Sequence, residues 1–340
     1  MGSVKDLVVL EEPKENKPGI GRFLFSDRYS VFDYGEMPDA IHGKGKALCM
    51  LSAYFFEKLE EAGFNTHYLG LYDAEDGRVK RFDEIDEAVN VMEIRLVRVV
   101  HPEKKNGYDY SVYKSLKGNF LIPVEVIYRN SLPEGSSVFR RLEKGQITLS
   151  DLGLSAMPES GERLEKPFID FSTKLESEDR YLSRDEVLEI CSISQNELQE
   201  ICRVATAVDE IITRETEKAG IVNEDGKIEL AFDEKRQLMV VDAVGTPDEC
   251  RFSFDGIEIS KEVLRRHYRK TDWYRRLQIL KGDEDWRKIL GAPPRLPEEL
   301  RKTVSEMYMA CCNEITGRKL FDVNSLRDII GRIKELVSDA

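Results

Sequence analysis

The sequence predicts an α+β fold, in which mostly antiparallel strands and helices form separate groups. The first half has several short apolar runs typical of strands and one clear helical stripe, whereas helical stripes become frequent after residue 183. Strands and helices do not alternate regularly, as they would in a doubly wound parallel sheet. We find no internal repeat and no low-complexity tract. These observations favour antiparallel sheets flanked by helices.

In the first half, two short apolar runs, residues 7–11 and 21–25, are separated by a polar segment and predict a β-hairpin with a long tip. A helix is predicted over about residues 46–62, because leucine and phenylalanine recur at helical spacing before a glycine. Residues 92–96 alternate like a half-buried strand. Residues 120–128 are more continuously apolar and indicate a central strand.

The second half begins with two capping boxes. Residues 183–186 and 194–197 both read Ser-x-x-Glu, the pattern of a helix start. The second precedes a long helical stripe. Residues 227–232 and 237–242 then predict two strands joined by a polar turn. The remainder is predicted to be helical, including residues 297–315 and 325–337 on the evidence of their apolar stripes.

Length and charge limit the function. The 340 residues suggest about two domains, and 51 Lys+Arg against 64 Asp+Glu give a net charge of −13. This charge argues against binding to nucleic acid or to an anionic membrane. No apolar run approaches the ~18 residues of a membrane span, and the six cysteines lack C-x-x-C spacing. We therefore expect an intracellular protein without a disulfide framework or zinc knuckle.

The two strands before and after the polar turn carry the most informative charges. Lys227 and Glu229 share one strand face, because side chains alternate. A four-residue turn that pairs Phe232 with Gln237 makes Asp242 the diagonal neighbour of Glu229, with a Cβ separation of roughly 7–8 Å. Two carboxylates beside a lysine suit Mg²⁺ bound to a triphosphate. A solvated, charged strand face is the alternative interpretation.

Two loops that precede helices could bind an anion. Residues 41–45 read Ile-His-Gly-Lys-Gly, and glycines at a helix start allow an anion to approach backbone N–H groups. The P-loop pattern is absent, so an ordinary turn is the alternative. Residues 129–137 lead from the central strand into a short helix that carries Arg140 and Arg141. Arg129 could anchor a phosphate there, with a polar connecting loop as the alternative.

Two further polar clusters have simple alternatives. Residues 26–33 form a dense polar segment that an Asx turn with an internal ion pair would explain. Residues 265–269 contain three arginines and a histidine, which form either an anion clamp or a solvated helix face.

Taken in order, six segments resemble the motifs of the SAICAR synthetase family, phosphoribosylaminoimidazole-succinocarboxamide synthase of purine biosynthesis. The family motifs are S-D-R-I-S-A-F-D, then I-P-G-K-G with L-S-x-F-W-F, P-x-E-x-x-x-R, G-S, D-x-K-x-E and D-E-x-x-T-P-D-S-S-R. The matching segments here are residues 26–33, 41–45 with 51–56, 123–130, 135–136, 225–229 and 242–251. Together they lie within about residues 2–275, in family order.

The resemblance implies an ATP- and Mg²⁺-dependent ligase. It would join carboxyaminoimidazole ribonucleotide (CAIR) to L-aspartate through an acyl phosphate, giving SAICAR, ADP and phosphate. It also implies a SAICAR-synthetase-like, two-domain fold: a β-rich ATP-binding domain over residues 1–118 and a larger α+β domain over 119–280 with the ribonucleotide and Mg²⁺ site. Residues 281–340 would be a helical extension packed on the core or on a partner subunit. We expect a cytoplasmic homo-oligomer with ATP in the cleft between domains.

The resemblance also assigns site residues by position. The residues lining the junction of the reactants would be Asp179, Asp225 and Lys227. ATP would be held by Lys5, Lys174 and the segment around Leu121, and Mg²⁺ by Glu229 and Asp242. The substrate-binding residues would be Asp27, Ser30, Lys44, Arg129, Gly135, Ser136, Arg251 and Arg269.

Three departures from the family pattern keep two other functions open. Ser3 stands where the family has a lysine, His42 replaces a proline, and Ala243 replaces a glutamate. One alternative is a small-molecule kinase with the same ATP–Mg²⁺ apparatus, which would release ADP without aspartate. The other, suggested by Ser3 and Ala243, is a nucleotide-binding regulatory protein that binds ATP without turnover.

Overall fold

Two antiparallel sheets form the centre of the computed structural model, which describes residues 4–32, 34–105, 107–133, 135–281 and 285–338. The smaller sheet has the strand order β1–β2–β5–β3–β4. Its strands are β1 (Lys5–Glu11), β2 (Gly19–Phe25), β3 (Tyr68–Asp73), β4 (Arg78–Lys80) and β5 (Val91–Leu96). The antiparallel pairing of β1 with β2 confirms the predicted hairpin.

The larger sheet has the order β10–β9–β8–β11–β13–β14, and β12 also pairs with β11. Its strands are β8 (Phe120–Ser131), β9 (Arg163–Thr173), β10 (Tyr181–Leu182), β11 (Val222–Phe232), β12 (Leu238–Val241), β13 (Cys250–Phe254) and β14 (Ile257–Glu258). A separate ribbon pairs β6 (Glu103–Lys105) with β7 (Gly107–Asp109). As predicted, the continuously apolar β8 is a central strand, buried along almost its whole length.

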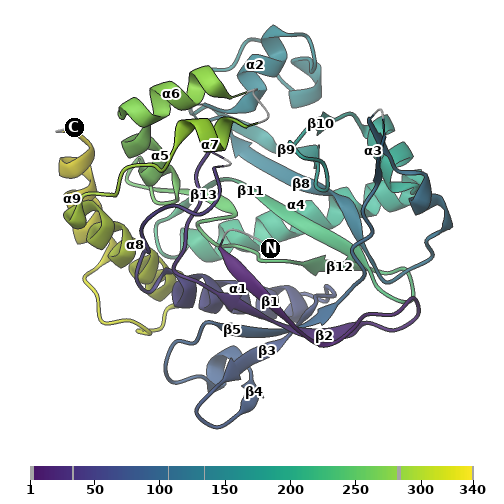
Figure 1. Ribbon diagram of the computed structural model, residues 1–340, viewed down its shortest axis with the longest axis horizontal. Coiled ribbons are helices and arrows are strands. Elements are labelled where there is room, and N and C mark those ends of the chain that lie inside the picture. The colour runs from purple at the N-terminus through teal and green to yellow at the C-terminus, as the bar shows by residue number, and fades with distance from the viewer. Residues whose placement is uncertain (1–3, 33, 106, 134, 282–284, 339–340) are drawn as a thin grey trace.

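Helices cover these sheets, which confirms the α+β class (Figure 1). They are α1 (Lys44–Glu61), α2 (Ser137–Glu143), α3 (Arg184–Cys191), α4 (Gln195–Glu217), α5 (Glu262–Arg269), α6 (Asp272–Leu280), α7 (Trp286–Leu290), α8 (Glu298–Thr316) and α9 (Leu326–Ser338). Short 3-10 helices lie at Phe82–Glu84, Ser111–Ser115 and Ser150–Leu152. Both predicted capping boxes are present, because Ser183 caps α3 and Ser194 caps α4.

The prediction that everything after residue 242 is helical was wrong for β13 and β14. In β13 the buried side chains of Cys250, Phe252 and Phe254 alternate with the more polar Arg251 and Ser253. This is the period-two pattern of a strand. The pairing of β13 with β11 places Arg251 beside Asp225, a contact on which the site depends.

The helices near the C-terminus pack on the core of their own chain. Helix α8 lies against α1, and α9 lies against α8, at one side of the molecule (Figure 1). One continuous hydrophobic core extends from Phe25 to Ile333. Three polar contacts add to this packing: Ser305 Oγ donates to the His42 carbonyl, and Arg318 donates to the carbonyls of Phe82 and Ile85.

A buried carboxylate, Asp209, fastens α4 to the larger sheet. Its Oδ1 accepts hydrogen bonds from Asn130 Nδ2 (2.6 Å) and Asn223 Nδ2 (3.0 Å). Burial raises its pKa to about 6, while the hydrogen bonds from Asn130 and Thr213 lower it. The native state therefore holds this proton more tightly than the unfolded chain. The resulting penalty to stability is absent below about pH 4 and complete above about pH 6.

The variant Asp209→Asn is thus expected to gain stability over the wild type as the pH rises. Between pH 4 and pH 7 the difference in unfolding free energy should move in favour of the variant by up to about 3 kcal/mol. Urea denaturation at both pH values measures this change. The same difference at both pH values would show that folding does not raise the pKa of Asp209.

Candidate active site

Two pockets lie along strands β8 and β11. The first, here called the hairpin pocket, has a volume of about 690 Å³, and its walls include β1. It is lined by all five residues predicted to hold nucleotide or metal: Lys5, Leu121, Lys174, Glu229 and Asp242. The second, here called the arginine pocket, has a volume of about 560 Å³. It is lined by seven other predicted residues: Arg129, Gly135, Asp179, Asp225, Lys227, Arg251 and Arg269.

Strand β11 contributes to both pockets. Asp225, Lys227 and Glu229 occupy alternate positions, so their side chains project from one face. The first two line the arginine pocket, and Glu229 lines the hairpin pocket. The two pockets are therefore separated by about two residues of strand, roughly 7 Å.

Ion pairs connect the charged side chains of the hairpin pocket. Lys5 Nζ donates to Asp242 Oδ2 at 2.7 Å, and Lys174 Nζ donates to Glu229. Burial and the nearby charge of Asp242 raise the pKa of Glu229. Burial alone would raise the pKa of Asp242 as well, but the charges of Lys5 and Lys174 hold it below its ordinary value. The pocket thus brings together two carboxylates that repel each other and two lysines that compensate them.

The predicted register of β11 with β12 was wrong by one residue. Phe232 pairs with Leu238 instead of Gln237, because the turn has five residues, closed by Asp233 through its hydrogen bonds with Gln237. Asp242 follows the end of β12 with a left-handed backbone (φ 69°), which breaks the alternation of side chains. Asp242 therefore still lines the same pocket as Glu229.

The arginine pocket is built around Asp225. Arg251 binds this carboxylate with two nitrogens, Nε at 2.8 Å and Nη2, and Arg129 Nη1 lies 3.5 Å from it. Arg129 is buried, and its Nη2 also donates to Asp170 at 3.1 Å. The charges of Asp225 and Asp170 outweigh burial and raise the pKa of Arg129. Arg269, by contrast, pairs with Glu262.

Glu125 connects the two pockets, although the sequence pattern gave it no role. Its Oε1 accepts hydrogen bonds from Lys227 Nζ at 2.9 Å and Lys174 Nζ at 3.4 Å. Lys227 also lies 3.5 Å from Glu249. These contacts hold one lysine of each pocket close to the other. The available signal for Glu125 was the glutamate of the P-x-E-x-x-x-R motif, which residues 123–130 match.

Lys261 was also missed. It lines the arginine pocket, and burial lowers its pKa despite the neighbouring carboxylates of Asp248 and Glu249. The basic cluster noted in the sequence begins four residues later, at Arg265, which lines the same pocket. Arg265 pairs with Glu262 at 3.1 Å, and the anion clamp stays a prediction.

Four predicted substrate-binding residues do not line either pocket: Asp27, Ser30, Lys44 and Ser136. Asp27 accepts hydrogen bonds from the N–H groups of Gly43 (3.2 Å) and Gly45 (2.9 Å), so the start of α1 is already capped. The N–H groups of these two glycines are therefore not free to bind an anion. Ser136 likewise caps α2.

Lys44 is fully buried and contacts Asp248, a residue of the arginine pocket. Its Nζ donates to Asp248 Oδ2 at 2.6 Å and to the Arg28 carbonyl at 3.2 Å. Asp248 lines the pocket and also accepts a hydrogen bond from Tyr308 Oη of α8 at 2.7 Å. Lys44 therefore positions a pocket residue. Ser3, where the family has a lysine, and Asp33, the last residue of the segment 26–33, lie outside the described residues.

Comparisons with known proteins all point to one family. Residues 2–279 match the family described as SAICAR synthetase. A protein of Archaeoglobus fulgidus with the provisional name phosphoribosylaminoimidazole-succinocarboxamide synthase is 62% identical over 337 residues, 99% of this chain and 100% of that protein.

Two solved structures have a similar fold. A SAICAR synthetase in complex with ADP has a TM-score of 0.61 at 21% identity and covers 94% of this chain and 97% of its own. The SAICAR synthase of Saccharomyces cerevisiae complexed with SAICAR has a TM-score of 0.62 at 21% identity, over 94% of each chain.

Proposed function

The chain belongs to the SAICAR synthetase family, and from this premise we propose how its two pockets divide the reaction. The protein is an ATP-dependent carbon–nitrogen ligase of purine biosynthesis, which joins CAIR to L-aspartate and yields SAICAR, ADP and phosphate. We assign ATP and CAIR to separate pockets because one face of β11 contributes side chains to both. Reactants bound in the two pockets would meet at Lys227.

The hairpin pocket is the ATP site in this proposal. Its apolar walls would pack against the adenine ring of ATP. They include Leu7, Val9, Leu96, Val97 and Leu121. Lys5 and Lys174 would contact the phosphates, since each already has a carboxylate partner that keeps it charged. Those carboxylates raise the pKa of both lysines, which favours the cationic form.

Glu229 and Asp242 fit a magnesium ion. Hard carboxylate oxygens are the ligands that Mg²⁺ prefers, and the ion is usually bound by one or two of them together with phosphate oxygens and water. The mutual repulsion of the buried Glu229 and the partly exposed Asp242 would be relieved by a divalent cation. In the described parts of the chain, no group of three or more His, Cys, Asp or Glu could hold a metal alone. We therefore propose that ion and nucleotide bind together, and the ion then neutralises phosphate charge.

The arginine pocket is the CAIR site in this proposal. Arg129, Arg251 and Arg269 would bind the ribonucleotide, with Gly135 at the loop beside them. Lys227 would stabilise negative charge as the CAIR carboxylate accepts the γ-phosphoryl group of ATP. The aspartate amine then attacks the acyl phosphate and displaces phosphate. Asp225 and Asp179 line the pocket where the amine must arrive.

A coupled assay tests the function directly. Purified protein should release ADP and form SAICAR only when CAIR, L-aspartate and ATP–Mg²⁺ are all present. ADP release that continues without aspartate would indicate a kinase. ATP binding in calorimetry without any turnover would indicate a regulatory protein, and correctly folded protein that gives no SAICAR would contradict the ligase assignment.

We also propose a cytoplasmic homo-oligomer. The six cysteines are all unpaired, as expected in a reducing compartment. Within the described residues, no helix is both long and apolar enough to cross a bilayer. Val8 and Leu10 are 42% and 51% exposed on the edge strand β1, where a second copy could pair with the sheet. Light scattering of the purified protein would give the number of subunits.

A further inference from the structure

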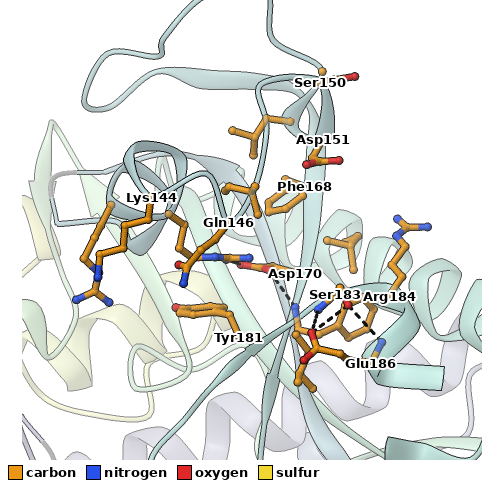
Figure 2. Close-up of a pocket in the computed structure, with 18 of the residues that line it drawn as sticks. Lys144, Gln146, Ser150, Asp151, Phe168, Asp170, Tyr181, Ser183, Arg184 and Glu186 are labelled. Carbon is orange, nitrogen blue, oxygen red and sulfur yellow. Dashed lines mark hydrogen bonds and ion pairs between the residues drawn. The ribbon is translucent and has the colours of Figure 1, made fainter. Parts of the chain in front are cut away.

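A third pocket lies beside the arginine pocket and carries charges that the ligase reaction does not use. This α2–α3 pocket has a volume of about 1120 Å³ and is lined by residues of α2, β9, β10 and α3 (Figure 2). Its cationic residues are Arg140, Arg141, Lys144, Lys166, Arg180 and Arg184. Its acidic residues are Asp151, Asp170 and Glu186. The lining is thus net positive, in a chain whose net charge is −13.

Four of these six cations make no ion pair with any residue that the structure describes. Within this part of the chain, Arg140, Lys144, Lys166 and Arg184 have no carboxylate within ion-pair distance. Arg180, in contrast, pairs with Glu186 at 2.9 Å. In Figure 2, Lys144 lies on one side of the pocket and Glu186 on the other. An anion bound in this pocket would offset the positive charges of these cations, which now repel one another.

Arg141 supplies a buried cation that its neighbours hold in place. It is only 5% exposed, and its Nε has no hydrogen-bond partner within the described chain. Its guanidinium lies 4.1 Å from the ring centre of Tyr181, and Nη1 donates to Asp170 Oδ2 at 2.5 Å. Tyr181 packs against the guanidinium, and one of its donors, Nε, is buried without a partner among the described residues. A fixed guanidinium with a spare N–H is well suited to phosphate.

Asp170 connects this pocket to the CAIR site. The same oxygen, Oδ2, accepts a hydrogen bond from Arg141 and another from Arg129 at 3.1 Å. Tyr181 lines both pockets, and Asp170 and both arginines are buried. A change in how Asp170 divides its contacts between the two arginines therefore acts on Arg129, the proposed ribonucleotide anchor.

We propose that the α2–α3 pocket binds a small phosphate-bearing anion, and that its binding weakens CAIR binding through Asp170. An anion that engages Arg141 competes with Asp170 for that guanidinium. Asp170 then pairs more closely with Arg129 and holds it away from the CAIR phosphate. The added negative charge acts in the same direction, so the effect is inhibitory. By linkage, CAIR weakens binding of the anion by the same factor.

Calorimetric titration with inorganic pyrophosphate, in the absence of Mg²⁺, tests the site itself. The wild type should bind one more equivalent than the double variant Lys144→Glu/Lys166→Glu. The control Lys235→Glu/Lys302→Glu changes the charge equally at exposed residues outside all three pockets and should match the wild type. Equal stoichiometry in the wild type and the Lys144→Glu/Lys166→Glu variant would overturn the proposal.

A second titration tests the coupling and rests on the proposed function. The dissociation constant for CAIR should rise with pyrophosphate and level off after about a 5-fold or greater increase. In the Lys144→Glu/Lys166→Glu variant this saturating increase should disappear. Only direct competition between pyrophosphate and CAIR for the CAIR site would remain, and it raises the dissociation constant without levelling off. The same dependence in both proteins would overturn the coupling. If CAIR does not bind at all, the proposed function fails, whereas the pyrophosphate stoichiometry still decides the site.

Discussion

Replacing Glu229 by glutamine is expected to lower kcat for SAICAR formation by about 10²- to 10³-fold, the range found when one group that stabilises transition-state charge is removed. The side chain keeps its size, so the hairpin pocket keeps its shape. What disappears is one of the two carboxylates proposed to hold Mg²⁺, while Lys174 keeps Glu125 as a partner. Initial rates at saturating CAIR, aspartate and ATP–Mg²⁺ measure the effect.

Asp242→Asn should behave in the same way, because the two carboxylates would share one ion. Glu234→Gln is the matched control: Glu234 is an exposed residue of the turn that follows β11, and its replacement should leave kcat unchanged. Circular dichroism and thermal unfolding show whether the variants are folded. Wild-type rates in both Glu229→Gln and Asp242→Asn would remove these residues as metal ligands.

Truncating Tyr308 is expected to be the most destabilising of the substitutions considered. Its ring is fully buried in α8, and its hydroxyl donates to Asp248, the partner of Lys44. Tyr308→Ala should reduce the unfolding free energy by about 3–5 kcal/mol, as for other large aromatic residues in a core. Tyr308→Phe keeps the packing and removes only a hydrogen bond to a charged group, worth about 1.5–3 kcal/mol.

Urea denaturation of the two variants separates packing from hydrogen bonding. It also tests whether the segment after residue 281 is a structural part of the enzyme. A segment that merely accompanies the core would unfold in its own transition, and Tyr308→Ala would leave the main transition in place. We expect a single transition that moves to lower urea.

The elements that could be predicted from sequence are those specified by local patterns. The β1–β2 hairpin, α1 and the caps at Ser183 and Ser194 all follow from neighbouring residues. The charges of β11 follow from its alternation. The register with β12 does not, because it depends on a turn held by the Asp233 side chain and on the left-handed backbone at Asp242.

The site needed information that no local pattern carries. Lys5, Leu121 and Lys174 came only from the family resemblance, because nothing in their neighbourhoods marks them. The placement of Lys44 outside both pockets has the opposite reason: its glycine-rich surroundings suggest an anion loop, yet its partner Asp248 is 204 residues away in sequence. Contacts at such separations are set by packing of the whole chain.

The contact between α1 and α8 has a consequence for biosynthesis. Ser305 binds the His42 carbonyl across 263 residues. At about 5–20 residues per second, a ribosome needs roughly 13–50 s to make the intervening chain. During that time the apolar face of α1 has no α8 to cover it, and the nascent chain depends on chaperones or on fast elongation to avoid aggregation. Expression yield is therefore governed by translation speed as well as by the stability of the finished fold.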